Sequence, residues 1–509
     1  MMRRLVILVS VLAAMALVVW IVPADDDAPV EVDLERSVSA LAGTTQTTDS
    51  VWMCAGAQSA AGIPSRHVVT ISNPSSRSVS AKVTSYQPPS ADGTRPPPVE
   101  LDVAVAGASV VALGADQFAG AEPGSVTVEA ATQLVVTHRI ISESLADEAP
   151  CASRGSTRWF FPAANSQLGG SARLWVFNPF SSDASIKFTA TTDGAVLDLK
   201  SLGGVVVPAR STRVIELGDA VQRRDQFALS VESRGASVVV DLVESTDGTT
   251  LPDGLQQSKG IRIQPGIGAT SNRILFADSE GVPGTQERIW VYNPNSEAVS
   301  VTVSVRPDDA SPDVYPEPFI VELDGFRYQM IDLSTESRLP PTGSRTVTVE
   351  TDDLGGVTAV RVMTVLAQDG WPLSSGTANS IGSNVAATEW LIGRVDAAEP
   401  GRSILRVVNP STDSIAVVTL SLIINGTEGP AGAVARVEVP PGRAQTIDVG
   451  PAASGDAPAM IRLSGSSAVI VERRSFGSSN GDLWTMPAIP VRGSLSVLEP
   501  LPRGLGAGR

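Results

Sequence analysis

The sequence predicts an all-β protein, in which four tandem immunoglobulin-like antiparallel β-sandwich repeats follow an N-terminal transmembrane helix. Two observations support this prediction. One is a strand-turn-strand pattern that occurs four times and turns each time at an Asn-Pro pair, beginning at Asn73, Asn178, Asn293 and Asn409. The other is the regular spacing of these four copies along the chain.

Each copy alternates apolar residues on both sides of its Asn-Pro pair. Residues two and four before each Asn are apolar, and the alternation resumes from the sixth residue after it. A period of two is typical of a half-buried strand. The proline fixes φ in the turn, and the asparagine side chain can bond the turn backbone. We therefore predict a β-hairpin at each pair.

The spacing indicates a repeat of just over a hundred residues. The copies open at Trp52, Trp159, Ile274 and Trp390, so successive starts are 107, 115 and 116 residues apart. Roughly seven strands per repeat, separated by frequent turn residues, are typical of two antiparallel sheets packed face to face. A single β-propeller is the alternative, but its blades take about 40–45 residues, and the sequence has no such shorter period.

The expected segments follow one another in a simple order. Residues 1–24 form a signal anchor or transmembrane helix, and residues 25–50 form a flexible tether. The four sandwich repeats span residues 51–155, 156–250, 271–382 and 383–495. A linker over residues 251–270 separates the second repeat from the third, and residues 496–509 form a disordered tail.

The N-terminal segment has the length and charge of a membrane anchor. Arg3 and Arg4 precede an uncharged run over residues 5–22 that is apolar except for Ser10. As a helix this run is about 27 Å long, close to the thickness of the hydrocarbon core. The two arginines favour the cytoplasmic side, which places the bulk of the chain outside the cytoplasm. The alternative is a cleaved signal peptide, which would make the protein secreted.

Composition excludes some classes of function. The formal net charge is −16 and no stretch is rich in Lys or Arg, so we expect no nucleic-acid partner. Two cysteines cannot make a four-Cys structural zinc site, the chain has only two histidines, and no calcium-loop motif occurs, so we expect no metal or cofactor. Because the protein is expected to be exported, we predict a disulfide between Cys54 and Cys151, which lie near the two ends of the first repeat.

Catalytic motifs are weak. Residues 477–481 match the string G-x-S-x-G, but they lie in a turn between antiparallel strands instead of the strand-to-helix turn that a nucleophile elbow requires. His67 and His138 could share a site with a carboxylate such as Asp102, but unrelated histidines at strand ends are the favoured interpretation. We therefore expect no enzyme.

Trp175 and Trp290 are the candidate binding residues. Each lies on the strand face opposite the core positions, where an exposed ring could stack on a glycan or contact a partner. The alternative is that these rings pack against a neighbouring domain or loop.

Several structural motifs carry a family resemblance. They are W-x-F near the start of a repeat, the alternating strand that ends in N-P-S, V-P-A-R-S-T-x-x-I-x-L-G from Val207 to Gly218, and a closing S-V-E-S followed by V-V-V. The set resembles an uncharacterised family of actinobacterial membrane-anchored, secreted proteins with immunoglobulin-like repeats. Repeats one and three depart from the V-P-A-R-S-T form. The resemblance implies a cell-envelope location and no known activity.

The function that we expect is that of a non-enzymatic extracytoplasmic cell-envelope protein, a membrane-anchored scaffold or binding module whose sandwiches form a rod or arc. Its expected partners are the membrane, through the N-terminal helix, and an envelope protein or glycan. The alternative is a carbohydrate-binding accessory protein of cell-wall or polysaccharide assembly.

Overall fold

The computed structural model describes residues 50–498, except for 57, 59–62, 91, 144, 200–201, 250–258, 311–313, 353–354, 366–375, 396–402, 454–457, 477–482 and 492–494. The predicted transmembrane helix, nearly all of the tether, residues 251–258 of the linker and the G-x-S-x-G string lie outside the described residues. The prediction of a linker is wrong for Gly260–Pro265, which form a strand of the second repeat. In the described part of the chain, no helix has the length and apolar character needed to cross a bilayer. The described residues all belong to one compact unit.

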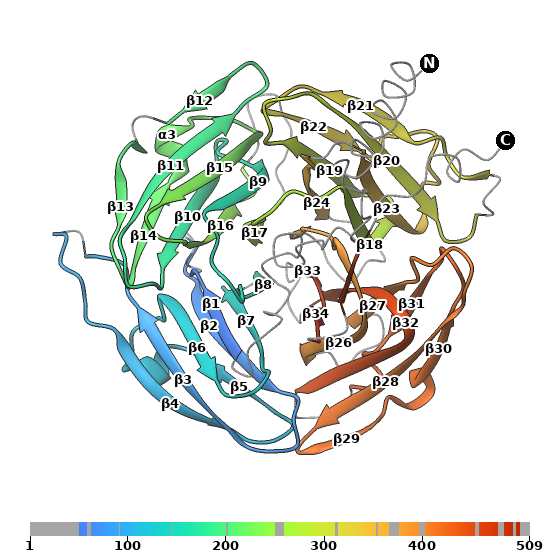
Figure 1. Cartoon of the computed structure of the whole chain (residues 1–509), viewed down its shortest axis with the longest axis horizontal. Coiled ribbons are helices and arrows are strands. Elements are labelled where there is room, and N and C mark those ends of the chain that lie inside the picture. The colour runs from blue at the N-terminus through green and yellow to red at the C-terminus, as the bar shows by residue number, and fades with distance from the viewer. Residues whose placement is uncertain are drawn as a thin grey trace, which may run out of the picture. The chain divides into compact units, whose positions relative to one another are not determined.

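The first repeat is a sandwich of two four-stranded antiparallel sheets (Figure 1). One sheet has the order β1 (Ser50–Cys54), β6 (Ser125–Ala130), β3 (Val79–Tyr86) and β4 (Val99–Val105). The other has the order β5 (Ser109–Leu113), β2 (Arg66–Asn73), β7 (Val135–Ile141) and β8 (Ala146–Pro150). Alternate apolar residues of the strands, such as Val69, Ile71, Val83 and Val128, form one core between the sheets.

The second repeat has the same strand order. Its first sheet consists of β9 (Arg158–Ala164), β15 (Phe227–Arg234) and β11 (Ala184–Thr191), with both β12 (Val196–Asp198) and β13 (Val205–Val207) paired to β11. Its second sheet runs β14 (Ser211–Glu216), β10 (Gly170–Asn178), β16 (Val239–Thr246) and β17 (Gly260–Pro265). A short helix, α3 (Leu217–Ala220), follows β14.

The third repeat again has two four-stranded sheets. The first runs β18 (Arg273–Gly281), β23 (Gly343–Thr351), β20 (Val299–Pro307) and β21 (Phe319–Leu323). The second runs β22 (Arg327–Asp332), β19 (Thr285–Asn293), β24 (Thr358–Val365) and β25 (Gly376–Ser380).

In the fourth repeat one long strand, β32 (Ala459–Phe476), serves both sheets. It pairs with β26 (Val385–Val395) and β28 (Ala416–Ile424) in one sheet, and β29 (Thr427–Pro430) and β30 (Arg436–Val439) pair with β28. Its second half pairs with β27 (Ser403–Val408) and β33 (Leu483–Pro487), and β31 (Ala444–Asp448) pairs with β27. Two short strands, β34 (Ile489–Pro490) and β35 (Leu495–Val497), add to β26. Two short 3-10 helices, η1 (Ala115–Phe118) and η4 (Gly432–Val434), follow β5 and β29.

The prediction of an all-β fold with four tandem antiparallel sandwiches is confirmed, because one strand order occurs four times. In each repeat the first strand pairs with the sixth, the sixth with the third, and the seventh lies between the second and the eighth. An immunoglobulin constant domain instead pairs its first strand with its second. The repeats thus share the sandwich architecture of that domain, while their strand order differs.

The predicted β-hairpin at each Asn-Pro pair is wrong. In the first repeat β2 pairs with β5 and β7, whereas β3 pairs with β4 and β6, so the two strands lie in opposite sheets. Both strands bury alternate residues in the same core, from opposite sides. Alternation therefore identified the strands correctly, but it does not determine which strands pair.

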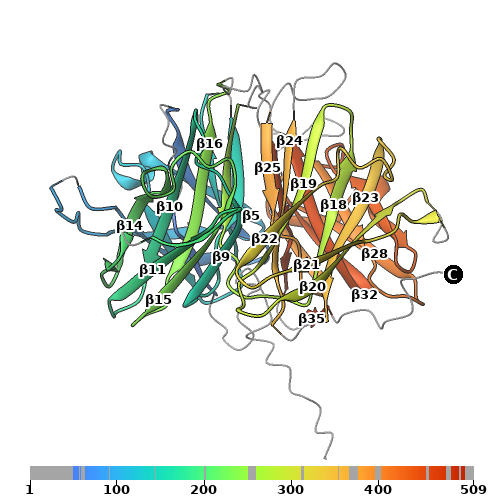
Figure 2. The same cartoon turned by 90° about the horizontal axis from the view of Figure 1, so that it is seen from above.

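The four sandwiches contact one another in a closed cycle within the described unit (Figures 1 and 2). Side-chain bonds join the first sandwich to the second (Thr212 to Ser125, 2.7 Å), the second to the third (Ser230 to Tyr292, 2.9 Å) and the third to the fourth (Arg406 to Asp308, 2.7 Å). A backbone bond from Gly426 to Ala108, 3.1 Å long, joins the fourth to the first. The expected rod or arc is therefore closed upon itself.

The eighth strand of each sandwich lies at the centre of this cycle (Figure 1). Asp147 on β8 accepts a bond from the Ile263 amide on β17, and the Ile263 carbonyl accepts one from Asn379 on β25. The Asn379 carbonyl in turn accepts a bond from Thr485 on β33. All five residues of β8 and all five of β33 are buried, so the centre is packed with protein.

Candidate functional site

The asparagine of each Asn-Pro pair is buried, and its side chain hydrogen-bonds the backbone of two different turns. We call these four residues, Asn73, Asn178, Asn293 and Asn409, the clasp asparagines. Asn73 Nδ2 donates to the carbonyl of Arg77, 2.8 Å away in its own turn, and to that of Val105 at the end of β4, 3.1 Å away. Its Oδ1 accepts a bond from the Ser75 amide. The same pattern recurs in the other repeats, at Asn178 with Ser182 and Val207, at Asn293 with Glu297 and Leu323, and at Asn409 with Ser414 and Val439. The predicted bond from the asparagine to the turn backbone is confirmed in all four copies.

The position three residues before each clasp is buried, and it is occupied by Thr70, Trp175, Trp290 and Arg406. In the second, third and fourth repeats this residue lies against the preceding sandwich. The Trp175 ring covers Gly56 of the first sandwich so closely that a Cβ on that glycine would lie 2.3 Å from it. Trp290 packs with Ala163 of the second sandwich. Arg406 donates to the Ala277 carbonyl of the third sandwich, 3.2 Å away.

Trp175 and Trp290 are therefore not an exposed binding surface. They are 1% and 4% exposed, and each ring is held at a contact between sandwiches. This placement corresponds to the alternative that the sequence left open, in which the rings pack against a neighbouring domain. The sequence could not distinguish the two, because the outer face of a strand is apolar both in an interface and in an aromatic binding platform.

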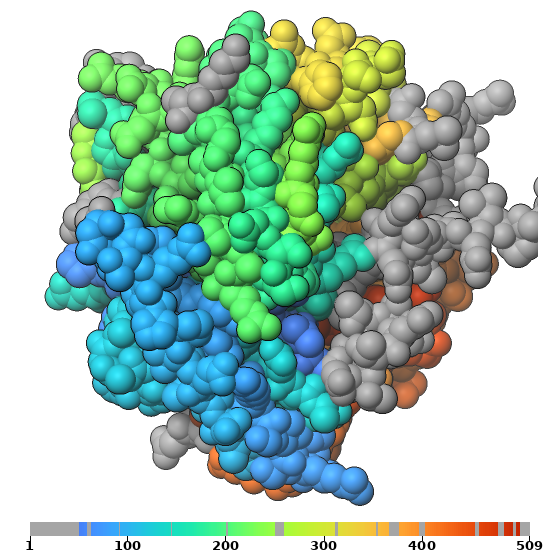
Figure 3. All heavy atoms as spheres, turned by 60° about the vertical axis from the view of Figure 1, so that its left-hand side comes forward, coloured from blue at the N-terminus to red at the C-terminus, as the bar shows by residue number. Residues whose placement is uncertain are grey.

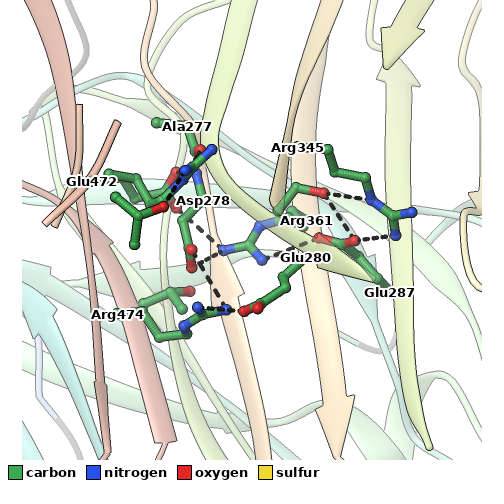
Figure 4. A network of polar contacts seen from close by, with 12 residues as sticks. Ala277, Asp278, Glu280, Glu287, Arg345, Arg361, Glu472 and Arg474 are labelled. Carbon is green, nitrogen blue, oxygen red and sulfur yellow. Dashed lines mark hydrogen bonds and ion pairs between the residues drawn. The ribbon is translucent and has the colours of Figure 1, made fainter. Parts of the chain in front are cut away.

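A buried network of charged side chains joins the third sandwich to the fourth (Figure 4). Arg361 on β24 donates to Glu287 at 3.2 Å, to Asp278 at 3.3 Å and to Glu472 of the fourth sandwich at 3.4 Å. Burial opposes the charge of Arg361, but the three carboxylates outweigh it and raise the pKa of the guanidinium. Arg345 donates to Glu287 at 2.7 Å.

The same network extends along β32. Arg474 reaches Asp278 at 3.6 Å and Glu280 at 2.5 Å (Figure 4). Burial raises the pKa of Asp278, but Arg474 and Arg361 outweigh it, so that this pKa is lowered overall. Buried charges are tolerated in proteins only when they are paired in this way, so the network holds the two sandwiches in one arrangement.

The two histidines of the chain touch each other where the first sandwich meets the second, a region called the first–second contact below. His67 on β2 and His138 on β7 are both fully buried, with His67 Nε2 3.3 Å from His138 Nδ1. His67 Nδ1 lies 2.9 Å from the Pro123 carbonyl, so it carries a proton and leaves Nε2 as the acceptor. His138 Nε2 lies 3.6 Å from Oδ2 of Asp241, on β16 of the second sandwich.

Burial controls the protonation of His67, His138 and Asp241. It lowers the pKa of His67 to about 4, and together with His67 it lowers the pKa of His138 well below the usual range. Burial raises the pKa of Asp241 to about 7, although Asp241 also accepts a bond from the Ala55 amide, 3.1 Å away. Two neutral imidazoles therefore face a carboxyl group that favours its protonated form.

The favoured interpretation of the histidines, as unrelated strand-end residues, is wrong. The structure brings His67 and His138 together, and Asp241 replaces the suggested Asp102, which lies on β4 opposite Lys82. Pairing of β2 with β7 places the imidazoles together, since Val69 faces His138 and His67 faces Ile140. No sequence signal identifies Asp241, because it comes from the next repeat.

The predicted disulfide is confirmed. Cys54 ends β1, Cys151 follows β8, and the two sulfurs are bonded. The bond joins the two sheets of the first sandwich. Among the described residues no group of three His, Cys, Asp or Glu side chains is arranged to hold a metal ion.

Exposed apolar side chains gather on the outermost strands of the first sheets. Val196 and Leu197 on β12 are 43% and 37% exposed, and Ile320 on β21 is 70% exposed. Each of these strands has one partner strand in the described part of the chain, β11 for β12 and β20 for β21. Figures 1 and 3 show the outer side of the molecule, where the first and second sandwiches lie in contact.

The comparisons with known proteins connect part of the chain to an uncharacterised family. Residues 147–308, less than half of the chain, match the model of a family of unknown function, DUF5719. No curated protein matches the chain.

Two solved structures show only slight likeness. A crystal structure of Thermotoga maritima 1070 is 14% identical, with 22% of this chain and 92% of that chain covered, and a TM-score of 0.18. The Streptomyces avermitilis α-L-rhamnosidase complexed with L-rhamnose is 12% identical, with 79% of this chain and 54% of that chain covered, and a TM-score of 0.10. At these scores neither likeness informs the fold or the function.

Proposed function

We propose that the protein is a non-enzymatic scaffold or binding module of the cell envelope, outside the cytoplasm. The observation that carries this proposal is that the second sheet of each sandwich lies against the first sheet of a neighbouring sandwich, so that the four contacts close into a cycle. A heterologous contact that closes produces a ring with a fixed number of units, which suits a protein that holds partners in place.

Two further observations support this location and mode of action. A buried disulfide is typical of oxidising compartments such as the bacterial periplasm or the cell surface. The cationic start and apolar run over residues 3–22 would hold the folded part at the membrane. We therefore propose a membrane-anchored protein whose folded part faces away from the cytoplasm.

The outermost strands are the proposed contact surface. Val196 and Leu197 on β12, and Ile320 on β21, combine exposed apolar side chains with an unpaired strand edge in the described residues. An extended segment of another protein could add to such an edge by backbone hydrogen bonds, with specificity from alternate side chains. An envelope protein is thus the proposed partner. The glycan alternative loses its supporting residues, since Trp175 and Trp290 are buried.

Photo-crosslinking in native membranes tests this proposal. A photoreactive amino acid is placed at Leu197 or Ile320 in the full chain, and at the exposed Lys82, on the inner strand β3, as the matched control. We expect one protein to be captured by the probes at Leu197 and Ile320 and not by the probe at Lys82. If both edges bind the same partner, Ile320→Asp should also reduce capture by the probe at Leu197. Equal capture at all three positions, or none, would contradict the proposal.

A further inference from the structure

The first–second and third–fourth contacts share one feature, a buried carboxylate that accepts a backbone amide of the preceding sandwich and faces a basic side chain. In the third–fourth contact Glu472 accepts the Asp278 amide at 2.9 Å and is paired with Arg361. In the first–second contact Asp241 accepts the Ala55 amide at 3.1 Å and faces His138.

His138 and Arg361 occupy equivalent positions in their repeats. His138 pairs with Val69 and Arg361 pairs with Ile289, and both partners lie four residues before the clasp asparagine. A guanidinium stays charged at any physiological pH, whereas an imidazole changes its charge within that range. The first–second contact therefore carries a titratable group where the third–fourth contact has a permanent cation.

Charged side chains approach the two histidines from the neighbouring elements. Asp241 approaches from β16, and Glu122 accepts the backbone amide of His67 at 3.0 Å. The other charged groups nearby have partners of their own: Glu148 is paired with Arg139 and Arg473, Arg262 with Glu244, and Asp147 accepts the Ile263 amide.

When both imidazoles are neutral, each proton between His67, His138 and Asp241 has one consistent position. Nδ1–H of His67 donates to Pro123, Nδ1–H of His138 donates to His67 Nε2, and Asp241 faces His138 Nε2. A proton on His67 Nε2 would remove the acceptor and place two N–H groups face to face across 3.3 Å. Two buried cations at that distance would also repel one another.

We propose that His67, His138 and Asp241 form an acid-sensitive latch, in which proton uptake by the imidazoles loosens the first sandwich from the second. The depressed pKa of each histidine means that its contribution to stability is complete above about pH 6.5 and is lost as pH falls toward the folded-state pKa, about 4 for His67. Asp241, with its pKa raised to about 7 by burial, acts in the opposite direction, and the latch opens because protonation removes the acceptor between the two imidazoles.

The test uses the full chain, purified without a polyhistidine tag. Because the chain has two histidines, histidine-labelled protein gives NMR imidazole signals from the latch alone. Hydrogen exchange at the Ala55 amide reports whether the contact opens, and the Asp278 amide is the matched reference at the contact that holds Arg361.

We expect both imidazoles to remain neutral down to pH 6 and to titrate together below it. In the same pH range exchange at Ala55, corrected for its intrinsic rate, should rise about tenfold per pH unit for each net proton taken up on opening. Exchange at Asp278 should not follow the imidazole titration. The double variant His67→Gln with His138→Gln should lack the acid step at Ala55.

Three results would overturn the latch. They are imidazoles that titrate near pH 6.5 as exposed histidines do, imidazoles that titrate without any change at Ala55, and a double variant that keeps the acid step. The first two are measured on the unmodified chain, so the test does not depend on the folding of a variant.

Discussion

At the scale of single residues, the clasp asparagines show how one side chain joins segments that are far apart in sequence. Asn178 is fully buried, and its amide bonds Ser182 and Val207 while its carbonyl oxygen accepts the Phe180 amide. These bonds satisfy backbone groups that would otherwise be buried without partners.

Asn178→Ala is therefore expected to destabilise the protein by about 2–3 kcal/mol, because the buried Val207 carbonyl and two partly buried backbone groups lose their partner, at about 1–3 kcal/mol for a buried group. Denaturant unfolding followed by intrinsic fluorescence measures the change. Ser181→Ala, at an exposed position of the same turn, is the control and should change the stability little. Equal effects of the two substitutions would contradict the role of the clasp.

Arg361→Ala is expected to cost about 3–5 kcal/mol, because it leaves the carboxylates of Glu287, Asp278 and Glu472 buried without this cation. Arg361 lowers the pKa of Asp278 and Glu472, so its loss raises the folded-state pKa of these two carboxyl groups, whose stabilising protonated form is present at low pH and is lost as pH rises. The variant should therefore lose more stability at pH 8 than at pH 5.

Guanidinium unfolding at the two pH values measures this difference. Arg338→Ala, in an exposed ion pair with Glu336, is the control for removal of an arginine. A loss that is equal at pH 5 and pH 8 would show that the network does not carry the effect.

At the scale of elements, the disulfide joins the first and last parts of one sandwich. Cys54 and Cys151 are 97 residues apart, so the bond closes a long loop. Replacing both by alanine should lower the free energy of unfolding by about 4–5 kcal/mol on the chain-entropy model.

Chemical unfolding of the oxidised protein and of the double alanine variant checks this value. A reductant should destabilise the unmodified protein and leave the variant unchanged. If the variant unfolds at the same denaturant concentration as the oxidised protein, the disulfide does not stabilise the fold.

The strand pairing also belongs to this scale. Alternation around Asn73 identified β2 and β3 and the residues they bury, such as Ile71 and Val83. It did not reveal that the two strands belong to opposite sheets, because a turn and a sheet-crossing connection can have the same residues. Pairing depends on register with distant strands, such as β2 with β7.

At the scale of the whole molecule, each sandwich contacts two others. Removal of the fourth sandwich by truncation after residue 382 should therefore expose two faces, those of the first and third sandwiches that β26 and β27 cover. Each face would lose packed apolar surface, at about 25 cal/mol for each Å² exposed.

Calorimetry of residues 1–382 and of the full chain tests this expectation. The truncated chain should melt at a lower temperature and bind more of a hydrophobic dye. An unchanged melting temperature would mean that the sandwiches are independent and that the closed cycle contributes no stability.

The sequence by itself determined the strands, the residues they bury, the fourfold repetition and the pairing of its two cysteines. These are properties of local periodicity, spacing and composition, which a chain carries before it folds. Only the tertiary structure decided that the cycle closes, that Trp175 and Trp290 are covered, and that Asp241 faces His138. The physical reason is that the outer face of each sandwich is covered by residues of another repeat. The pattern of residues within one repeat does not predict which surface will cover it.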